Sequence, residues 1–229
     1  MGGVDPLIDL TLATLAFIAT HFVSSTPLRM TLVEAFGERA FVGAYSVVSL
    51  LTIGWMSLAY GRAPVVPLIQ VPGLEAWPLV VMPFAFILVA AGVMTRNPSL
   101  VGQQHVLKAE EPARGIVRVT RHPVMWGIAL WAAVHLLARG DAASLIFFGG
   151  FLFVALAGTR LIDARKGDTL GEDWKRFAAV TSNVPFTAIV EGRNRLVFAE
   201  IGWKRTGVGL ALFAVLLMAH PYLFKARAY

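Results

Sequence analysis

Hydrophobic residues gather in six long runs that shorter polar segments separate. The runs lie at about residues 6–24, 41–60, 74–94, 123–138, 142–161 and 206–223. Most approach the ~20 residues that a helix needs to cross the hydrocarbon core of a bilayer, and the fourth is short. Only "ARGD" separates the fourth run from the fifth, which predicts a helical hairpin that turns at Gly140. The pattern predicts an all-α, polytopic transmembrane helical bundle of about six spans, forming a single domain over residues 1–229.

The composition supports this interpretation. Hydrophobic residues make up 57% of the 229 residues and charged residues only 15%, whereas roughly a quarter of a soluble domain is charged. The chain has no cysteine, which excludes disulfides, thiolate metal sites and a cysteine nucleophile. The start, "MGGVDPLIDL", carries Asp5 and Asp9 and lacks a basic region, so we expect the first run to stay as a membrane span.

The basic residues predict the orientation of the spans. Sixteen of the 20 lysines and arginines fall in the segments 25–40, 95–122 and 160–205. The positive-inside rule places these segments in the cytoplasm and both termini outside. We therefore expect an integral protein of the bacterial cytoplasmic membrane, with its N-terminus outside. The net charge of +6 is then explained by orientation and by contact with anionic membrane lipids, and we expect no nucleic acid as a partner.

A further helix is expected in the longest polar stretch, 162–204. Within "LGEDWKRFAAV", Leu170, Trp174 and Phe177 recur at helical spacing with charges between them. This pattern is typical of a short amphipathic helix at the membrane interface, here on the cytoplasmic side.

Three histidines are candidate functional residues. His122 precedes Pro123 and so lies near the start of the fourth span. His135 lies inside that span, four residues after Trp131, and an ionisable side chain there is a functional candidate. His21 lies at the end of the first span. Each ring could instead cap a helix or bond to a neighbouring helix, while His105 and His220 are expected to have no special role.

The types of residue around these histidines favour haem over a hydrolytic metal. Imidazole is a common axial ligand of haem iron, and helical bundles build cofactor sites from side chains on facing helices. Few acids lie within the spans, and the motifs HExxH, GxGxxG, GxSxG and the P-loop are absent. Without cysteine, a haem would be non-covalent haem b. Met125, Trp126 and Trp131 could line an apolar slot for a hydrophobic small-molecule substrate, or they could be ordinary packing.

Two segments resemble the NnrU family. They are "HFVSSTPLRMTLVEAFGERAFVGAYSVVSL" (21–50) and "TRHPVMWGIALWAAVHLLARGD" (120–141), and the similarity runs from about residue 10 to "SNVPF" at 182–186. The resemblance implies an integral membrane protein with haem b. In the plant branch, the zeta-carotene isomerases, the haem serves a cis-to-trans isomerisation of a carotenoid double bond. In bacteria the family is associated with denitrification and nitric oxide reductase, which implies a respiratory membrane complex as a partner.

The resemblance also implies site residues. The family's histidines fall at His21, His122 and His135, and the axial iron ligands of the isomerases would map to His21 and His135. Arg29 and Arg121 complete the candidate cofactor-binding set. Where the plant isomerase has a cysteine, this chain has Ala132, so a thiolate mechanism is impossible here. His135 lies 13 residues beyond His122, about 20 Å along a helix, whereas the predicted topology places His21 at the depth of His122. Either the first span is tilted or broken near "THFVSS", or the ligand pair is not His21–His135, and the pair stays open.

Two alternative functions remain at this point. "RHP" and "LGEDWKRFAAVTSNVP" are similar to the C-terminal half of isoprenylcysteine carboxyl methyltransferases and related phospholipid methyltransferases. That similarity implies a S-adenosylmethionine-dependent methyltransferase of a lipid-like substrate, with Arg121, His122 and the nearby Asp163 in the cofactor site. Trp174 and Phe177 stand where those enzymes have tyrosines. The other alternative is a non-enzymatic assembly factor for a membrane complex.

Overall fold

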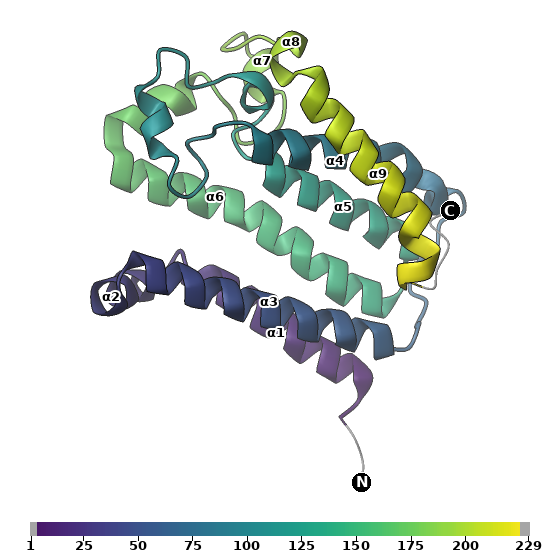
Figure 1. Ribbon diagram of the computed structural model, residues 1–229. Coiled ribbons are helices and arrows are strands. Elements are labelled where there is room, and N and C mark those ends of the chain that lie inside the picture. Colours follow the sequence, from purple (N-terminus) through teal and green to yellow (C-terminus); the bar gives the residue numbers. More distant parts are fainter. Residues whose placement is uncertain (1–3, 225–229) are drawn as a thin grey trace. The chain divides into compact units, whose positions relative to one another are not determined.

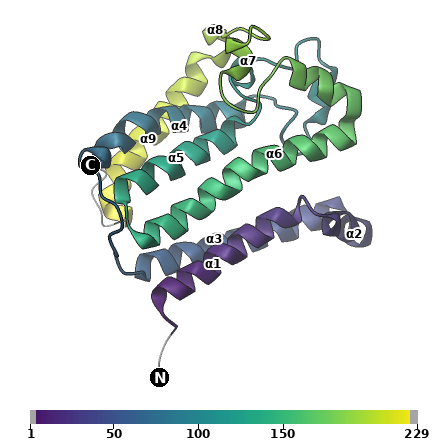
Figure 2. The same ribbon diagram turned by 180° about the vertical axis from the view of Figure 1, so that it is seen from behind.

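The computed structural model describes residues 4–224, and within that range the chain is built from helices without any strand (Figures 1 and 2). The α-helices are α1 (Pro6–Val23), α2 (Pro27–Phe36), α3 (Glu38–Arg62), α4 (Trp77–Met94), α5 (Pro123–Arg139), α6 (Ala142–Ala179), α7 (Thr187–Val190), α8 (Phe198–Ile201) and α9 (Trp203–Phe224). Three short 3-10 helices accompany them, η1 (Leu74–Ala76), η2 (Gln104–Lys108) and η3 (Gly115–Arg118).

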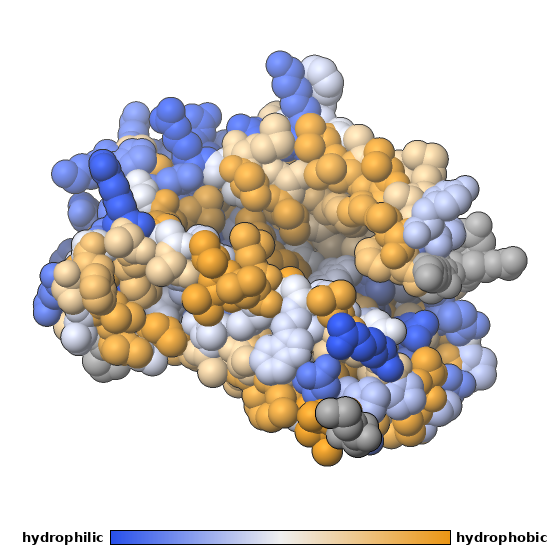
Figure 3. Space-filling model, turned by 60° about the horizontal axis from the view of Figure 1, so that its bottom comes forward, coloured by the Kyte–Doolittle hydropathy of each residue, from blue (hydrophilic) through white to orange (hydrophobic). Residues whose placement is uncertain are grey.

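The predicted all-α membrane bundle is confirmed. Five helices are long and apolar enough to cross a membrane, namely α1, α3, α4 with η1, α6 and α9. The predicted fourth span corresponds to α5, an apolar helix of 17 residues. Large apolar side chains are widely exposed on these helices, among them Leu50 on α3 and Phe84 on α4, and Figure 3 shows such side chains over much of the face it presents. The chain is therefore an integral membrane protein, since a lipid environment stabilises such surfaces. Its predicted orientation stays a prediction.

The residues group into two compact units, each assembled from two separate stretches of the chain. Unit 1 comprises residues 1–75 and 132–154, and unit 2 comprises residues 76–131 and 155–229. The helices α5 and α6 each contribute to both units. The prediction of a single domain over residues 1–229 stays a prediction.

In unit 1, α1 lies beside α3 (Figures 1 and 2). The helix α1 begins where the Asp5 carboxylate accepts the backbone N–H of Leu7 at 2.8 Å, with Pro6 in the first turn, as expected for an N-cap. Asp9 accepts the indole N–H of Trp55 at 3.0 Å, which joins α1 to α3. These contacts use the few polar groups of the two spans to fix their register.

The predicted hairpin turn between the fourth and fifth spans is confirmed. The helix α5 ends at Arg139, α6 begins at Ala142, and Gly140 between them has a left-handed φ of 58°. A Cβ at Gly140 would lie 2.0 Å from the carbonyl oxygen of Ile69. The buried Asp141 accepts the backbone N–H of Ser144 at 2.9 Å and caps α6. Only glycine fits this position, because both the backbone conformation and the close approach exclude a side chain.

In unit 2, the helices pack closely through glycines. The helix α4 lies against α9, where Gly209 approaches the backbone of Ile87. A Cβ at Gly127 of α5 would lie 2.8 Å from the carbonyl oxygen of Ala85 on α4. Small residues allow such close packing between apolar helices in a membrane, where van der Waals contact largely replaces the hydrophobic effect.

The helix α6 differs from the predicted span. The apolar run predicts a helix over 142–161, but the helix continues to Ala179, with one non-helical residue at Gly171. The part of α6 after Gly171 corresponds to the predicted amphipathic helix, whose presence is confirmed. Its apolar residues Trp174 and Phe177 are 4% and 1% exposed and pack against Ala91 and Val117. The amphipathic face is therefore buried within unit 2 itself rather than open to lipid.

A buried ion pair ties η3 to α8 in unit 2. The Arg118 guanidinium, whose side chain is 8% exposed, donates to the Glu200 carboxylate at 2.8 and 2.9 Å. The backbone N–H of Gly115 donates to the same carboxylate at 2.8 Å. The hydrogen bond from Arg118 lowers the pKa of Glu200 from 4.5 to about 2, against the opposing effect of desolvation. The hydrogen bond to Glu200 correspondingly raises the pKa of Arg118.

We predict that Gly140→Ala destabilises the protein by about 1–3 kcal/mol, because a left-handed conformation is costly for a side chain and the Cβ meets the Ile69 carbonyl. Gly149→Ala is the matched control, since a Cβ there meets nothing within 4 Å in the interior of α6 and alanine favours the helix. Thermal unfolding in detergent, followed by circular dichroism, compares them. Equal melting temperatures for the two variants would contradict this account of the turn.

We also predict acid-dependent stability from Glu200. Because its pKa is lower in the folded protein, its contribution is complete above about pH 4.5 and is lost as the pH falls towards 2. Wild type should therefore be more stable than Glu200→Gln above about pH 4.5. This difference in the free energy of unfolding should shrink as the pH falls towards 2. A Glu200 difference that does not change with pH would rule out the lowered pKa.

Candidate functional site

The Asp163 carboxylate on α6 is the centre of a polar cluster in unit 2. It accepts hydrogen bonds from the Arg121 guanidinium at 2.8–3.1 Å, from His122 Nε2 at 2.7 Å and from the Asn183 side-chain amide at 2.9 Å. The Asp163 side chain is 19% exposed and that of His122 only 1%. A charge this buried is stable only when it is paired and hydrogen-bonded, and Asp163 meets both conditions.

The segment 181–186 is bonded to the start of α5 and completes the cluster. The Asn183 carbonyl accepts from the Thr120 hydroxyl at 2.6 Å and from the Trp126 indole at 2.8 Å. The Ser182 carbonyl accepts the backbone N–H of Arg121 at 3.0 Å. Asn183 was not singled out by the sequence analysis, because its partners are 20 to 63 residues away. Its place in "SNVPF", beside the predicted amphipathic helix, was the only signal.

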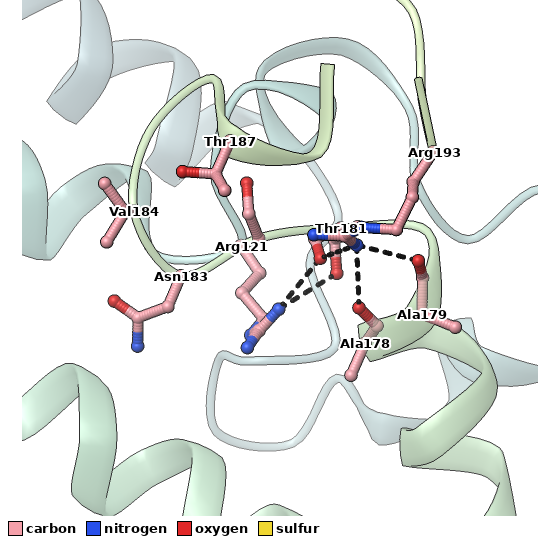
Figure 4. Close-up of a pocket in the computed structure, with 9 residues that line it drawn as sticks. Arg121, Ala178, Ala179, Thr181, Asn183, Val184, Thr187 and Arg193 are labelled. Atoms are coloured by element: carbon pink, nitrogen blue, oxygen red, sulfur yellow. Dashed lines mark hydrogen bonds between the residues drawn. The ribbon is translucent and has the colours of Figure 1, made fainter. Parts of the chain in front are cut away.

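A pocket opens beside this cluster, still within unit 2. It has a volume of about 530 Å³, which lies within the range of small-molecule sites. Arg121 and Arg193 reach the Thr181 carbonyl from two sides, at 3.1 and 2.9 Å (Figure 4). Arg193 also donates to the carbonyl of Ala179 at the end of α6 at 2.7 Å. The pocket is lined by Arg121, Ala178, Ala179, Thr181, Ser182, Asn183, Val184, Thr187 and Arg193.

The structure gives the three candidate histidines different surroundings. His122 lies at the start of α5, as predicted, and its Nε2 is bonded to Asp163. His21, in α1, has its Nδ1 2.8 Å from the Phe17 carbonyl. A carbonyl only accepts, so Nδ1 carries the proton and Nε2 is the basic nitrogen. His21 is therefore arranged as a metal-binding histidine usually is, with its other nitrogen oriented by a backbone carbonyl.

His21 and His135 both belong to unit 1. The His135 ring stacks on Phe148 with centroids 5.2 Å apart, and the His21 ring lies 4.2 Å from that of Phe17. A continuous series of ring contacts joins the two histidines. It runs from His21 through Phe17, Phe151, Phe147 and Phe148 to His135, with successive centroids 4.2–5.3 Å apart. Four phenylalanine rings thus lie between the two candidate ligands in this series, whereas His122 belongs to unit 2.

The remaining candidates have structural contacts. Arg29 forms an ion pair with Glu38 at 2.6 Å, between α2 and α3. Trp126 belongs to the polar cluster. Of the residues considered for an apolar slot, Trp131 lines an apolar groove of about 220 Å³ between α4 and α5, together with Met82, Ala85, Phe86, Val89, Gly127 and Ile128. Over residues 4–224, no group of three or more histidine, aspartate or glutamate side chains could hold a metal ion. A metal here would depend on fewer protein ligands, as haem iron does.

Comparisons with known proteins bear on this arrangement. The family model described as NnrU protein matches residues 9–228. The chain is 31% identical over 176 residues to the chloroplastic 15-cis-zeta-carotene isomerase of Arabidopsis thaliana, covering 70% of this chain and 44% of that protein. It is 40% identical over 86 residues to the Zea mays protein of the same name, covering 36% and 22%. The chain thus spans less than half the length of these curated relatives. No solved structure matches it.

We predict that Asp163→Asn destabilises the protein by about 3–5 kcal/mol, because it leaves the Arg121 guanidinium buried without its counter-charge. Glu172→Gln is the control. It removes an acid of the same helix whose ion pair with Lys175 is exposed, and such pairs contribute about 1 kcal/mol or less. Thermal unfolding in detergent micelles measures both. A similarly small effect of both substitutions would show that the cluster does not hold unit 2 together.

Proposed function

Because the chain belongs to the NnrU family, we propose that it is an integral membrane isomerase that converts a cis double bond of a long hydrophobic polyene to trans, with haem b as its cofactor. The similarity to two plant proteins named 15-cis-zeta-carotene isomerase supports the reaction class and the substrate class. The membrane-spanning helices support a substrate that is dissolved in the bilayer.

The observation that carries the proposal is the setting of His21. Its Nδ1 is bonded to the Phe17 carbonyl, which leaves Nε2 as a nitrogen that can bind iron. His21 and His135 would hold the haem, because imidazole is a common axial ligand of haem iron. His122 is the weaker candidate, because its Nε2 is already bonded to Asp163. We therefore take His21 and His135, both in unit 1, as the proposed haem ligands.

The surroundings of His21 and His135 suit a reaction away from water. Phe17, Phe147 and Phe148 are each less than 9% exposed, and the rings of Phe17 and Phe148 contact His21 and His135 directly. Bound haem b would supply reversible donation of electron density to the conjugated chain, which lowers the barrier to rotation about one double bond. The residues of the chain would orient the iron through the imidazoles, exclude water through the phenylalanines and hold the apolar substrate.

A second candidate function rests on the polar cluster. Arg121, His122 and Asp163 lie together beside a pocket of about 530 Å³. Polar groups beside such a pocket favour a cofactor site, as a S-adenosylmethionine-dependent methyltransferase would need. Substitution of His135, in the other unit, should leave methyl transfer unchanged. Under the isomerase proposal the same substitution should be damaging.

The test is isomerisation by the purified, haem-loaded protein of a 15-cis-zeta-carotene substrate in liposomes, followed by chromatography of the products. We predict that wild type forms the trans product and that His21→Ala reduces the rate by about a hundredfold, because the haem would lose one of its proposed ligands. His105→Ala is the control and should retain the wild-type rate, since it removes a histidine from η2.

Two results would contradict the proposal. Equal rates for His21→Ala and wild type would show that His21 does not act in the reaction. A haem-loaded wild type without any isomerisation would point to a redox role instead, for example beside a respiratory membrane complex of the kind that serves denitrification.

A further inference from the structure

The pocket beside the polar cluster has two cationic groups at one side. Asp163 and Thr181 engage at most four of the five N–H groups of Arg121. Glu191 and the backbone carbonyls at the end of α6 likewise engage at most four of those of Arg193. Each guanidinium thus keeps an N–H for a further acceptor. Both guanidiniums donate to the carbonyl of Thr181, and both residues line this pocket.

The rest of the pocket can accept a polar group but is not wholly polar. The Thr187 hydroxyl and the Asn183 side chain line it (Figure 4), alongside the apolar Ala178 and Val184. The pocket therefore combines donors for an anion with an apolar wall. A small, fully hydrated anion would make no apolar contact with that wall.

The segment around the pocket exposes large apolar side chains. Val184 is 54% exposed, Phe186 50% and Val190 85%. Phe186 is the one non-glycine residue of the described chain with a left-handed φ, 67°, a conformation that usually costs energy. The Val119 carbonyl accepts the Phe186 backbone N–H at 2.8 Å and holds this turn. In an integral membrane protein, such a rim is favourable where it meets acyl chains at the membrane interface.

We propose that this pocket binds the phosphate of an anionic membrane phospholipid, with its acyl chains against Val184, Phe186 and Val190. Arginine is well suited to phosphate, because its N–H groups match the phosphate oxygens and it is weakly hydrated. The apolar rim distinguishes a lipid from a free phosphate. The inference goes beyond the proposed isomerisation, because the pocket lies in unit 2 and the candidate haem ligands lie in unit 1.

The test is native mass spectrometry of the full, delipidated protein titrated with phosphatidylglycerol, with phosphatidylcholine as the zwitterionic comparison. We expect phosphatidylglycerol to bind more tightly and Arg193→Gln to weaken it about tenfold, the effect of losing one charged hydrogen bond. Arg176→Gln is the matched control. It removes an equally charged side chain near the end of α6, one that is 76% exposed and paired with Asp173, and should leave the affinity unchanged.

A second variant keeps the test valid if Arg193→Gln unfolds, because Arg193 also caps the end of α6. Val190→Ser changes only an exposed side chain and should weaken binding of the full-length lipid while sparing glycerol phosphate. Equal losses for Arg193→Gln and Arg176→Gln would overturn the proposal. The proposal would also be overturned if inorganic phosphate bound as tightly as phosphatidylglycerol. Displacement of the bound lipid by S-adenosylmethionine would likewise overturn it, because the pocket would then belong to a soluble ligand. None of these readouts depends on haem or isomerisation.

Discussion

The pairing of Asp163 with Arg121 is the interaction on which unit 2 depends. A carboxylate and a guanidinium near membrane-spanning segments are costly unless they satisfy each other. Asp163 meets this demand by accepting hydrogen bonds from Arg121, His122 and Asn183, which belong to the start of α5 and to the segment after α6. One buried charge thus connects three parts of the chain that are far apart in sequence. The pocket exists because this cluster holds the segment 181–186 beside α5.

The same pairing separates the roles of the histidines. His122 stands in the most recognisable motif of the chain, "RHP", yet its Nε2 is bonded to Asp163 and its side chain is almost fully buried. This setting describes a positioning residue of the polar cluster. His21 and His135 instead lie among phenylalanine rings in unit 1. The aromatic surroundings of His21 and His135 and the charged surroundings of His122 therefore belong to different units of the chain.

The sequence predicted the features that depend on local pattern. The spans follow from runs of apolar residues, the turn at Gly140 from a glycine between two such runs, and the start of α5 from Pro123. Features that depend on distant contacts could not be predicted. Asp163 was noted only through a family likeness, and its pairing with Arg121 joins residues 42 positions apart. The helix after Gly171 was predicted from its spacing, but the pattern could not show that Trp174 and Phe177 face Ala91 and Val117 instead of lipid.

The measurement that tests the central claim most directly is an absorption spectrum of the purified protein, oxidised and then reduced with dithionite, with a pyridine haemochrome assay of the bound haem. The account predicts one b-type haem per chain. It also predicts that His21→Ala and His135→Ala lose or shift the spectrum, while a folded His122 variant keeps it. A folded protein that stays colourless after expression with ample haem would contradict the account, and so would a spectrum that depends only on His122.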